Sequence, residues 1–338
     1  MHRVGIVGAS GYVGAELLRL CAAHPGFELA WATAGAHAGA AVADLHPHLA
    51  AALPELVLAG YQPELVEGID LVFFALPHGT SSTLVPEVRD RGPVVVDLAA
   101  DFRLADPALY PRWYGEEHPA PDLLGQFACG LPELFRSELA GATAVAVPGC
   151  YPTAAALALA PLLRAGVIEP AGVVVDAASG VSGAGRAPKA TTTFCAVDED
   201  FRAYGLLDHR HTPEIEQATG AQVLFTPHLA PMTRGILATC YARPAATTST
   251  GELLDLLAGA YGGERFVVVT EGPPSTRATA GSNCAHLTAR HDHRTGWVLV
   301  LCALDNLVKG AAGQAVQCAN VALGVDEGAG LPVAGLAP

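Results

Sequence analysis

A cysteine stands where an apolar run meets a helix-forming segment in "AVAVPGCYPTAAALALAPLL", residues 144–163. If the helix begins at Tyr151, Pro152 falls in its first turn, where a missing N–H costs nothing, and Cys150 becomes the N-cap. The positive end of the helix dipole lowers the pKa of a thiol placed there. The same N–H groups can stabilise the oxyanion that forms when a thiolate attacks a carbonyl. We therefore predict that Cys150 is a nucleophile that forms a covalent acyl intermediate.

Such a nucleophile needs an acid/base, and "LLDHRHTPEIEQATG" offers His209 and His211 just before a helix predicted from Pro213. Residues two apart in an extended segment share a face, so both imidazoles can point into one cleft. We choose His211, the nearer to the helix start, as the acid/base, with His209 as the alternative. The HxH pairs at 209/211 and 291/293 lack further ligands at a zinc spacing, so no metal site is predicted.

The other cysteines are expected to be structural. The eight cysteines include no CxxC pair, which predicts reduced thiols and a cytoplasmic protein. Buried structural roles are expected for Cys21, Cys195, Cys240, Cys302 and Cys318, and are favoured for Cys129 and Cys284.

A glycine-rich turn follows the first predicted strand in "GIVGASGYVGAELL". Glycines between a strand and a helix let the backbone approach a pyrophosphate, which the helix N-terminus also attracts. The GxxGxxG spacing is a weak signal alone, but its position after a strand and before an amphipathic helix favours dinucleotide binding over an empty turn. The predicted cofactor-binding residues of this turn are Gly8, Ser10, Gly11, Tyr12, Val13 and Gly14.

The end of the second predicted strand indicates which dinucleotide is bound. An NAD site usually has an acidic residue there, but "WATAGAHAG" has none after Glu28. Thr33, Gly35 and His37 can instead receive a 2′-phosphate. The sequence therefore predicts NADP.

The predicted elements fall into two groups. Short apolar strands at 3–9, 27–33, 71–76, 94–99 and 144–149 alternate with helices, which predicts an α/β, Rossmann-type doubly wound parallel sheet. Longer runs at 172–180, 222–232, 235–244, 265–272 and 285–305 predict an α+β domain, with "HRTG" as a hairpin turn. A helix is expected from Asn306 onward. We predict an NADP-binding domain of residues 1–148 completed by 306–338, and a catalytic and oligomerisation domain of residues 149–305.

Charge and hydropathy limit the partners. The net charge of −14 argues against nucleic acid and anionic membranes, and no apolar run is long enough to span a membrane. The N-terminus "MHRVGIVGASG" lacks the features of a signal peptide. An anionic substrate would need local arginines, because only Lys189 and Lys309 are lysines.

Several longer motifs resemble those of the N-acetyl-γ-glutamyl-phosphate reductases, relatives of the aspartate-semialdehyde dehydrogenases. The resemblance runs nearly end to end, through "GASGYVGAELLRL", "FFALPHGTSS", "VVDLAADFRL", "YGEEHP", "GLPEL", "PGCYPT", "SGVSGAGR", "HRHTPEIEQ", "TPHLAPMTRGI" and "NLVKGAAGQA". It implies NADPH-dependent reduction of an acyl phosphate through a cysteine thioester, in arginine biosynthesis, with inorganic phosphate as a product. A homodimer or homotetramer is expected.

The resemblance also implies roles for individual residues. Cys150 would be the nucleophile and His211 the acid/base. Arg103 of "ADFRL" would bind phosphate, and Arg186 of "SGAGR" would bind carboxylate or phosphate unless it is a surface arginine. Tyr204 would line the same pocket. Near the nicotinamide the resemblance places Gly180, Ser182 and Gly183, and toward the cofactor or its sheet it places the helix with Asn306, Gly310 and Gly313.

Three alternatives remain open. Related aminoadipyl or carrier-linked acyl phosphates are not excluded by any residue, although the acidic charge disfavours an acidic carrier protein. An aspartate-semialdehyde dehydrogenase is disfavoured by "HRHTPEIEQ" and "DFRLADPALYPRWYGEEHP". A non-catalytic nucleotide-binding redox sensor would need neither the arginine of "DFR" nor the histidine pair.

Overall fold

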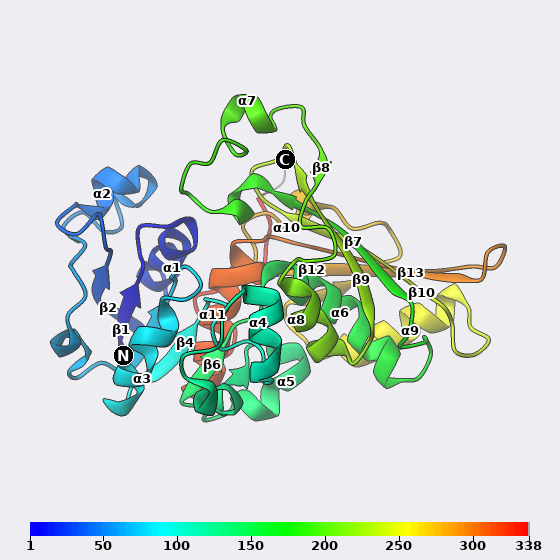
Figure 1. The fold of residues 1–338 in the computed structure, drawn as a ribbon, viewed down its shortest axis with the longest axis horizontal. Helices are drawn as coiled ribbons and strands as arrows, with labels where there is room; N and C mark the ends of the chain where they lie inside the picture. The colour runs from blue at the N-terminus through cyan, green and yellow to red at the C-terminus, as the bar shows by residue number, and fades with distance from the viewer. Residues whose placement is uncertain (337–338) are drawn as a thin grey trace. The chain divides into compact units, whose positions relative to one another are not determined.

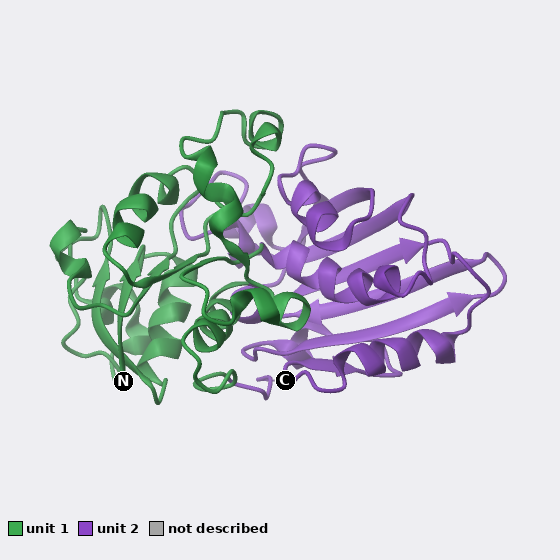
Figure 2. Ribbon diagram, turned by 90° about the horizontal axis from the view of Figure 1, so that it is seen from below, with its two compact units in different colours: residues 1–148, 311–331 green, residues 149–310, 332–338 purple. Residues whose placement is uncertain are grey.

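The computed structural model describes residues 1–336, which divide into two compact units (Figure 2). Unit 1 comprises residues 1–148 and 311–331, and unit 2 comprises the described residues 149–310 and 332–336. The chain therefore passes from one unit to the other after Pro148, Gly310 and Leu331.

Unit 1 is built on a parallel sheet. Its strands are β1 (His2–Val7), β2 (Phe27–Thr33), β3 (Leu71–Phe74), β4 (Val94–Asp97), β5 (Ala128–Cys129) and β6 (Ala144–Ala146). Within the described part of the chain they lie in the order β2-β1-β3-β4-β6-β5, and every pairing is parallel. The chain starts at β1, adds β2 on one side and then crosses to β3 on the other. Ligands of such sheets bind at the carboxyl ends of the strands beside this reversal.

Six α-helices belong to the described part of unit 1 (Figure 1). They are α1 (Tyr12–Ala22), α2 (Val42–Leu45), α3 (Ser81–Asp90), α4 (Tyr110–Tyr114), α5 (Pro132–Leu139) and α11 (Gly313–Ala322). The helix α11 comes from the far end of the chain, yet it contacts α1, α5 and β4. The expected return of a C-terminal helix to the first domain is thus confirmed.

Unit 2 contains a mixed sheet. Its strands are β7 (Val173–Gly180), β8 (Arg202–Ala203), β9 (Val223–Ala230), β10 (Ile236–Ala242), β11 (Val267–Val269), β12 (Ala285–Asp292) and β13 (Trp297–Leu304). Over the described residues the strand order is β11-β12-β13-β10-β7-β9-β8, with β7·β9 and β11·β12 parallel and the remaining pairs antiparallel. The predicted α/β fold with a second α+β domain is confirmed, as is the hairpin turn at 293–296 between β12 and β13.

Helices cover one face of this sheet. The helices of unit 2 are α6 (Cys150–Arg164), α7 (Phe194–Val197), α8 (His211–Thr219), α9 (Thr250–Tyr261) and α10 (Thr276–Thr279). The helix α6 contacts β10, β13, α8 and α9, so these three helices form one layer. Alternate residues of β10, such as Ala238 and Cys240, are fully buried, whereas Leu237 and Tyr241 on the opposite face are only half-buried.

The expected helix from Asn306 is wrong in its first part. Val308–Ala312 forms a π-helical turn, and α11 begins only at Gly313. The cause is Asp305, whose side chain accepts hydrogen bonds from the amides of Leu307 and Val308, while its carbonyl accepts one from Gly310. Residues 306–310 also belong to unit 2 by their contacts, unlike the predicted division.

The end of the described chain returns to unit 2 as well. The amide of Asn283 donates to the carbonyl of Pro332, and the amide of Leu336 donates to that of Ala280. Within residues 1–336, no helix is both long and apolar enough to cross a membrane.

Candidate active site

Cys150 is the first residue of α6, and Gly149 rather than Cys150 is the N-cap, which corrects the predicted position by one residue. Gly149 has extended backbone angles (φ −65°, ψ 161°), and its carbonyl accepts the first intrahelical hydrogen bond from Thr153, at 2.9 Å. Pro152 has no N–H, so its place in the first turn of the helix costs no hydrogen bond. The helix therefore presents N–H groups and positive potential beside the Cys150 thiol.

Two glycines allow other segments to approach the nucleophile. A Cβ atom at Gly149 would overlap the Nε2 and Cε1 atoms of His211, so the imidazole lies directly against the residue before Cys150. A Cβ atom at Gly310 would lie 2.7 Å from the Cβ of Cys150. Gly310, which we had expected near the cofactor or its sheet, therefore packs on the nucleophile within unit 2.

Glu214 links His211 to the start of α6. Its carboxylate is buried; Oε2 accepts a 2.9 Å hydrogen bond from the Gly149 amide, and Oε1 lies 3.9 Å from Nε2 of His211. The helices α6 and α8 contact each other (Figure 1). This contact brings the residues that carry a thiol, an imidazole and a carboxylate close to one another. Glu214 is not among the predicted site residues, although an acid three residues after His211 at the start of a helix is a usable signal.

His209 has a different environment from His211. Its Nδ1 accepts a 3.1 Å hydrogen bond from the His211 amide, so the single proton of the neutral ring is on Nε2. Its ring packs edge-on against Tyr151, Tyr204 and Phe225, with centroids 6.0, 5.4 and 5.3 Å away. Burial is the main reason that the pKa of His209 is lowered to about 4, so His209 is neutral near pH 7.

Tyr204 belongs to the same aromatic group. Its hydroxyl donates to the hydroxyl of Tyr151 at 3.2 Å, and the Tyr151 hydroxyl donates to the carbonyl of His228 at 3.0 Å. The structure thus places Tyr204 beside His209.

Three segments meet near the end of β7. The Asn306 side chain accepts from the Gly235 amide at 2.7 Å and donates to the Ser182 hydroxyl at 3.0 Å. A Cβ atom at Gly183 would lie 2.7 Å from the Oγ of Ser179, so this loop needs glycine. The structure brings Ser182, Gly183 and Asn306 together, whereas Arg186 lies on the exposed segment that follows.

The predicted dinucleotide turn has the local geometry that a pyrophosphate requires. Gly8 has φ +92° and Gly14 packs against the carbonyl of Gly8, where a Cβ atom would overlap it. At Gly11, the N-cap of α1, a Cβ atom would meet nothing within 4 Å. The turn therefore offers open space above a helix N-terminus. Ser10 and Val13 are half-buried there, and Tyr12 is exposed.

At the end of β2, Gly35 and His37 are exposed as a phosphate site requires, but the Thr33 side chain is not. Thr33 is buried and its carbonyl accepts from the amides of Gly8 and Ala9, so it supports the turn through its backbone. Gly35 and His37 are exposed just beyond it, and no acidic residue occurs between 34 and 41. Gly35 and His37 are thus better placed than the Thr33 side chain to meet a phosphate.

Arg103 lies beyond the carboxyl end of β4 in unit 1. Its Nη2 donates to the carbonyl of Leu98 at 2.6 Å, and its charge favours the ionised form of Asp97. Burial nevertheless raises the pKa of Asp97 to about 7. The neighbouring Asp101 is also buried, but His78, the Ser82 side chain and the Gly79 amide hold its pKa at about 2.

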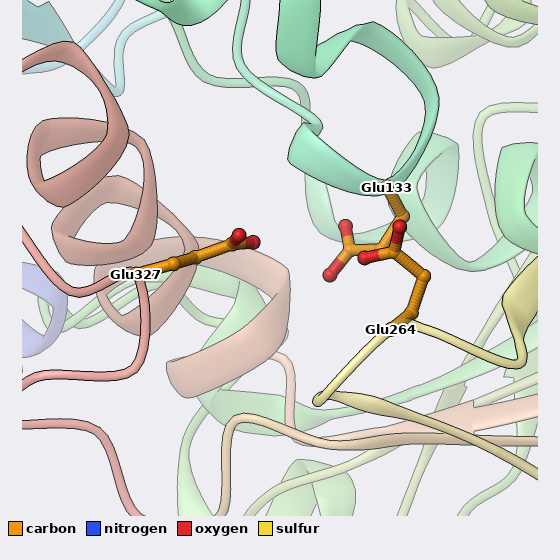
Figure 3. Close-up of side chains that lie close together, drawn as sticks. All are labelled: Glu133, Glu264 and Glu327. Atoms are coloured by element: carbon orange, nitrogen blue, oxygen red, sulfur yellow. The ribbon is translucent and has the colours of Figure 1, made fainter. Parts of the chain in front are cut away.

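Other reactive side chains have structural partners. Glu133 and Glu327 of unit 1, drawn in Figure 3 with Glu264 of unit 2, both accept from the Gln317 amide at 2.8 Å, and Arg136 pairs with Glu327 at 3.0 Å. Their contacts are those of a structural polar network.

The remaining cysteines divide by burial. Cys195 is exposed on the short helix α7, which corrects the expectation of a buried residue, and Cys129 is half-buried. Burial raises the pKa of Cys21 and Cys240 to about 12. The other buried thiols are Cys284, Cys302 and Cys318.

Comparison with solved structures confirms the fold. Aspartate semialdehyde dehydrogenase II from Vibrio cholerae superposes with a TM-score of 0.73 at 17% identity, covering 96% of this chain and 98% of that one. Aspartate semialdehyde dehydrogenase from Candida albicans, solved with NADP, gives a TM-score of 0.71 at 16% identity, covering 95% of this chain and 98% of that one.

Sequence comparison identifies the family. The family models "Semialdehyde dehydrogenase, NAD binding domain" and "Semialdehyde dehydrogenase, dimerisation domain" match residues 3–142 and 150–306. N-acetyl-gamma-glutamyl-phosphate reductase from Desulforudis audaxviator is 49% identical over 350 residues, covering 100% of both chains. The enzyme of the same name from Magnetococcus marinus is 47% identical over 333 residues, covering 96% of this chain and 95% of the relative. The chain belongs to the N-acetyl-γ-glutamyl-phosphate reductase family.

Proposed function

We propose that the protein reduces N-acetyl-γ-glutamyl phosphate to N-acetylglutamate γ-semialdehyde and inorganic phosphate with NADPH, in arginine biosynthesis. The observation that carries the proposal is the Cys150 thiol at the start of α6, with the His211 imidazole against Gly149 and the buried Glu214 carboxylate behind it. The near full-length identity to reductases of this name supports the choice of substrate. A catalytic thiol must stay reduced, which supports a cytoplasmic location for the reaction.

In the first step His211 accepts the proton of Cys150, and Glu214 stabilises the resulting imidazolium. The thiolate attacks the acyl carbon, and the N–H groups at the start of α6 stabilise the oxyanion. The carbon–oxygen bond to phosphate then breaks, so phosphate leaves and a thioester remains on Cys150. We assign the leaving phosphate to Arg103, because guanidinium binds phosphate bidentately.

In the second step the thioester becomes a thiohemiacetal and then the aldehyde. The dinucleotide, when bound, supplies the hydride for this reduction. Reduction leaves the thiohemiacetal as its oxyanion, which re-forms the carbonyl as the carbon–sulfur bond breaks, and the proton held by His211 returns to the Cys150 thiolate. His209 stays neutral throughout and holds the His211 backbone through its Nδ1 acceptor.

We propose that NADP is the dinucleotide. The turn from Gly8 to Gly14 would hold its pyrophosphate, and the segment from Thr33 to His37, which lacks an acid, would accept the 2′-phosphate. We assign the nicotinamide end of the dinucleotide to Ser182, Gly183 and Asn306. These residues lie together in unit 2, where the Asn306 side chain donates a hydrogen bond to the Ser182 hydroxyl.

The reverse reaction tests the function. N-acetylglutamate semialdehyde and NADP⁺ should yield NADPH, measured by absorbance, only when inorganic phosphate is present, and NAD⁺ should be at least about tenfold poorer. Activity on an aminoadipate or carrier-linked analogue instead would keep the chemistry and change the substrate. Thiol labelling that no aldehyde or acyl phosphate affects would favour the redox-sensor alternative.

We further propose that the protein forms a homodimer or homotetramer through the sheet face of unit 2 opposite α6. Val174, Tyr241, Trp297 and Leu299 help to line a cavity of about 460 Å³ on that face. The dimerisation-domain model that matches this unit supports a second copy as the partner.

Leu299→Glu tests the interface. A buried, unpaired carboxylate costs several kcal/mol, so the dissociation constant should rise about a hundredfold or more. Sedimentation velocity should then detect the monomer, while Val57→Glu, at an exposed site of unit 1, should keep the native assembly. An unchanged sedimentation coefficient for Leu299→Glu would exclude this face.

A further inference from the structure

Ala9 lies in the glycine-rich turn of unit 1, between Gly8 and Ser10, and is fully buried. The amides of Gly8 and Ala9 donate to the carbonyl of Thr33, at 3.1 and 2.8 Å, so β2 holds the N–H side of the turn. These two bonds do not fix the direction of the Ala9 carbonyl. That direction matters for binding an anion, because a carbonyl oxygen carries partial negative charge and would repel a phosphate that it faced.

The His46 side chain fixes the direction of this carbonyl. Its Nε2 atom lies 3.0 Å from the carbonyl oxygen of Ala9, and because a carbonyl can only accept, Nε2 carries the proton of this hydrogen bond. His46 directly follows α2 and is only 5% exposed, so it binds the carbonyl from the interior of the unit. The turn is open at Gly11, where a Cβ atom would meet nothing within 4 Å. The Ala9 oxygen thus points to a buried ring rather than into this open space.

The segment proposed to receive the 2′-phosphate, residues 33–37, is anchored by other residues. The amide of Gly39 donates to the carbonyl of Leu58 at 2.7 Å, and the amide of Leu58 donates back to the carbonyl of Ala40 at 2.9 Å. Neither bond involves His46. A change of the His46 side chain should therefore alter the glycine-rich turn and leave this segment in place.

Without the His46 donor, the Ala9 carbonyl would be buried without this partner. Such a group is costly, so the peptide would be expected to turn its oxygen toward water, on the side from which a pyrophosphate approaches. We propose that His46 is a positioning residue for the dinucleotide, which keeps the Ala9 carbonyl away from the pyrophosphate and so raises the affinity of unit 1 for NADP and NAD alike. This inference rests on the proposed binding of a dinucleotide at this turn.

The test compares ligands that share only part of NADP. NADP⁺ and NAD⁺ contain the pyrophosphate, whereas 2′-AMP has the adenosine 2′-phosphate and no pyrophosphate. His46→Phe keeps an aromatic ring but has no donor, so calorimetry should show the Kd for NADP⁺ and for NAD⁺ raised about tenfold each. The Kd for 2′-AMP should stay within about twofold of wild type, because the segment that would bind it is anchored without His46.

Three further variants complete the test. His46→Gln can donate from its side-chain amide, so its Kd for NADP⁺ should stay within about threefold of wild type. His48→Phe makes the same substitution at an exposed position of the turn Pro47–Leu49 and should change none of the three constants. If His46→Phe does not fold, His46→Met, which also lacks a donor but has a flexible side chain, should give the same result.

Three outcomes would overturn the inference. Equal rises of Kd for 2′-AMP and for the dinucleotides would make His46 a structural residue of the unit. An unchanged Kd for NADP⁺ in His46→Phe would refute the role, and a tenfold rise in His46→Gln would show that the hydrogen bond to Ala9 is not its basis.

Failure of the proposed cofactor would be recognised separately, in the wild-type protein. Tighter binding of NAD⁺ than of NADP⁺ would overturn the choice of NADP, while a tenfold rise of the NAD⁺ Kd in His46→Phe would still support the role of His46. Wild-type protein that binds neither dinucleotide would overturn the dinucleotide site, and this inference with it.

Discussion

Cys150→Ser is expected to abolish turnover, with a loss of kcat of about 10⁴-fold or more. A serine hydroxyl is far less acidic than a thiol, so neither the α6 N-terminus nor His211 can supply a comparable nucleophile at neutral pH. NADP binding should stay near normal, because the glycine turn belongs to unit 1. Phosphate-dependent NADPH formation and fluorescence titration with NADP⁺ would measure the two effects.

Mass spectrometry gives the direct control for this prediction. Incubation of wild type with the acyl phosphate, without reduced cofactor, should add one N-acetylglutamyl group, and Cys150→Ser should gain none. Cys195→Ser, at the exposed cysteine of α7, should behave as wild type in both assays. An adduct that persists in Cys150→Ser, or activity above about one per cent, would remove Cys150 as the nucleophile.

His211→Ala is expected to lower kcat by about 10²–10⁴, the usual effect of losing a general acid–base group. Its imidazole is the one that lies against Gly149 and faces Glu214, so in the proposed mechanism it exchanges a proton with Cys150 and Glu214 stabilises the resulting charge. Glu214→Gln can still accept the hydrogen bond from the Gly149 amide but has no negative charge. We therefore expect kcat to fall less in Glu214→Gln than in His211→Ala. Steady-state kinetics across pH would separate these effects.

His209 provides the matched comparison. Asparagine can accept a hydrogen bond from the amide two residues on, as Nδ1 of His209 does, so His209→Asn should retain most of kcat. His209→Phe keeps an aromatic ring but cannot accept the hydrogen bond from the His211 amide, so its kcat should fall further than that of His209→Asn. Because the pKa of His209 is about 4, the acid limb of kcat/KM between pH 5 and 8 should not move in His209→Asn. If His209→Asn is as inactive as His211→Ala, the two roles are reversed.

Features that depend on neighbouring residues were predictable from the sequence. The glycine turn, the alternation of strands and helices in residues 1–148 and the hairpin at 293–296 follow from backbone preferences and hydrophobic periodicity. Cys150 was predicted at a helix mouth because proline and glycine punctuate the chain there. The one-residue error, with Gly149 as the N-cap, arose because its extended backbone is set by the carboxylate of Glu214, sixty-five residues away in sequence.

Only the tertiary structure decided how distant segments share one site. Both histidines of the HxH pair suit acid/base chemistry by type and spacing, and their roles separate only because α8 packs on α6, turning His211 toward Gly149 and enclosing His209 among aromatic rings. Gly310 likewise lies against Cys150 in a turn that Asp305 holds, because the Asp305 carbonyl accepts a hydrogen bond from the Gly310 amide. The sequence by itself determined the reacting groups and the local elements that hold them, because these depend on short-range chemistry. Burial, hydrogen-bond partners and close approach depend on packing between remote segments, so the division of labour among those groups was decided by the tertiary structure.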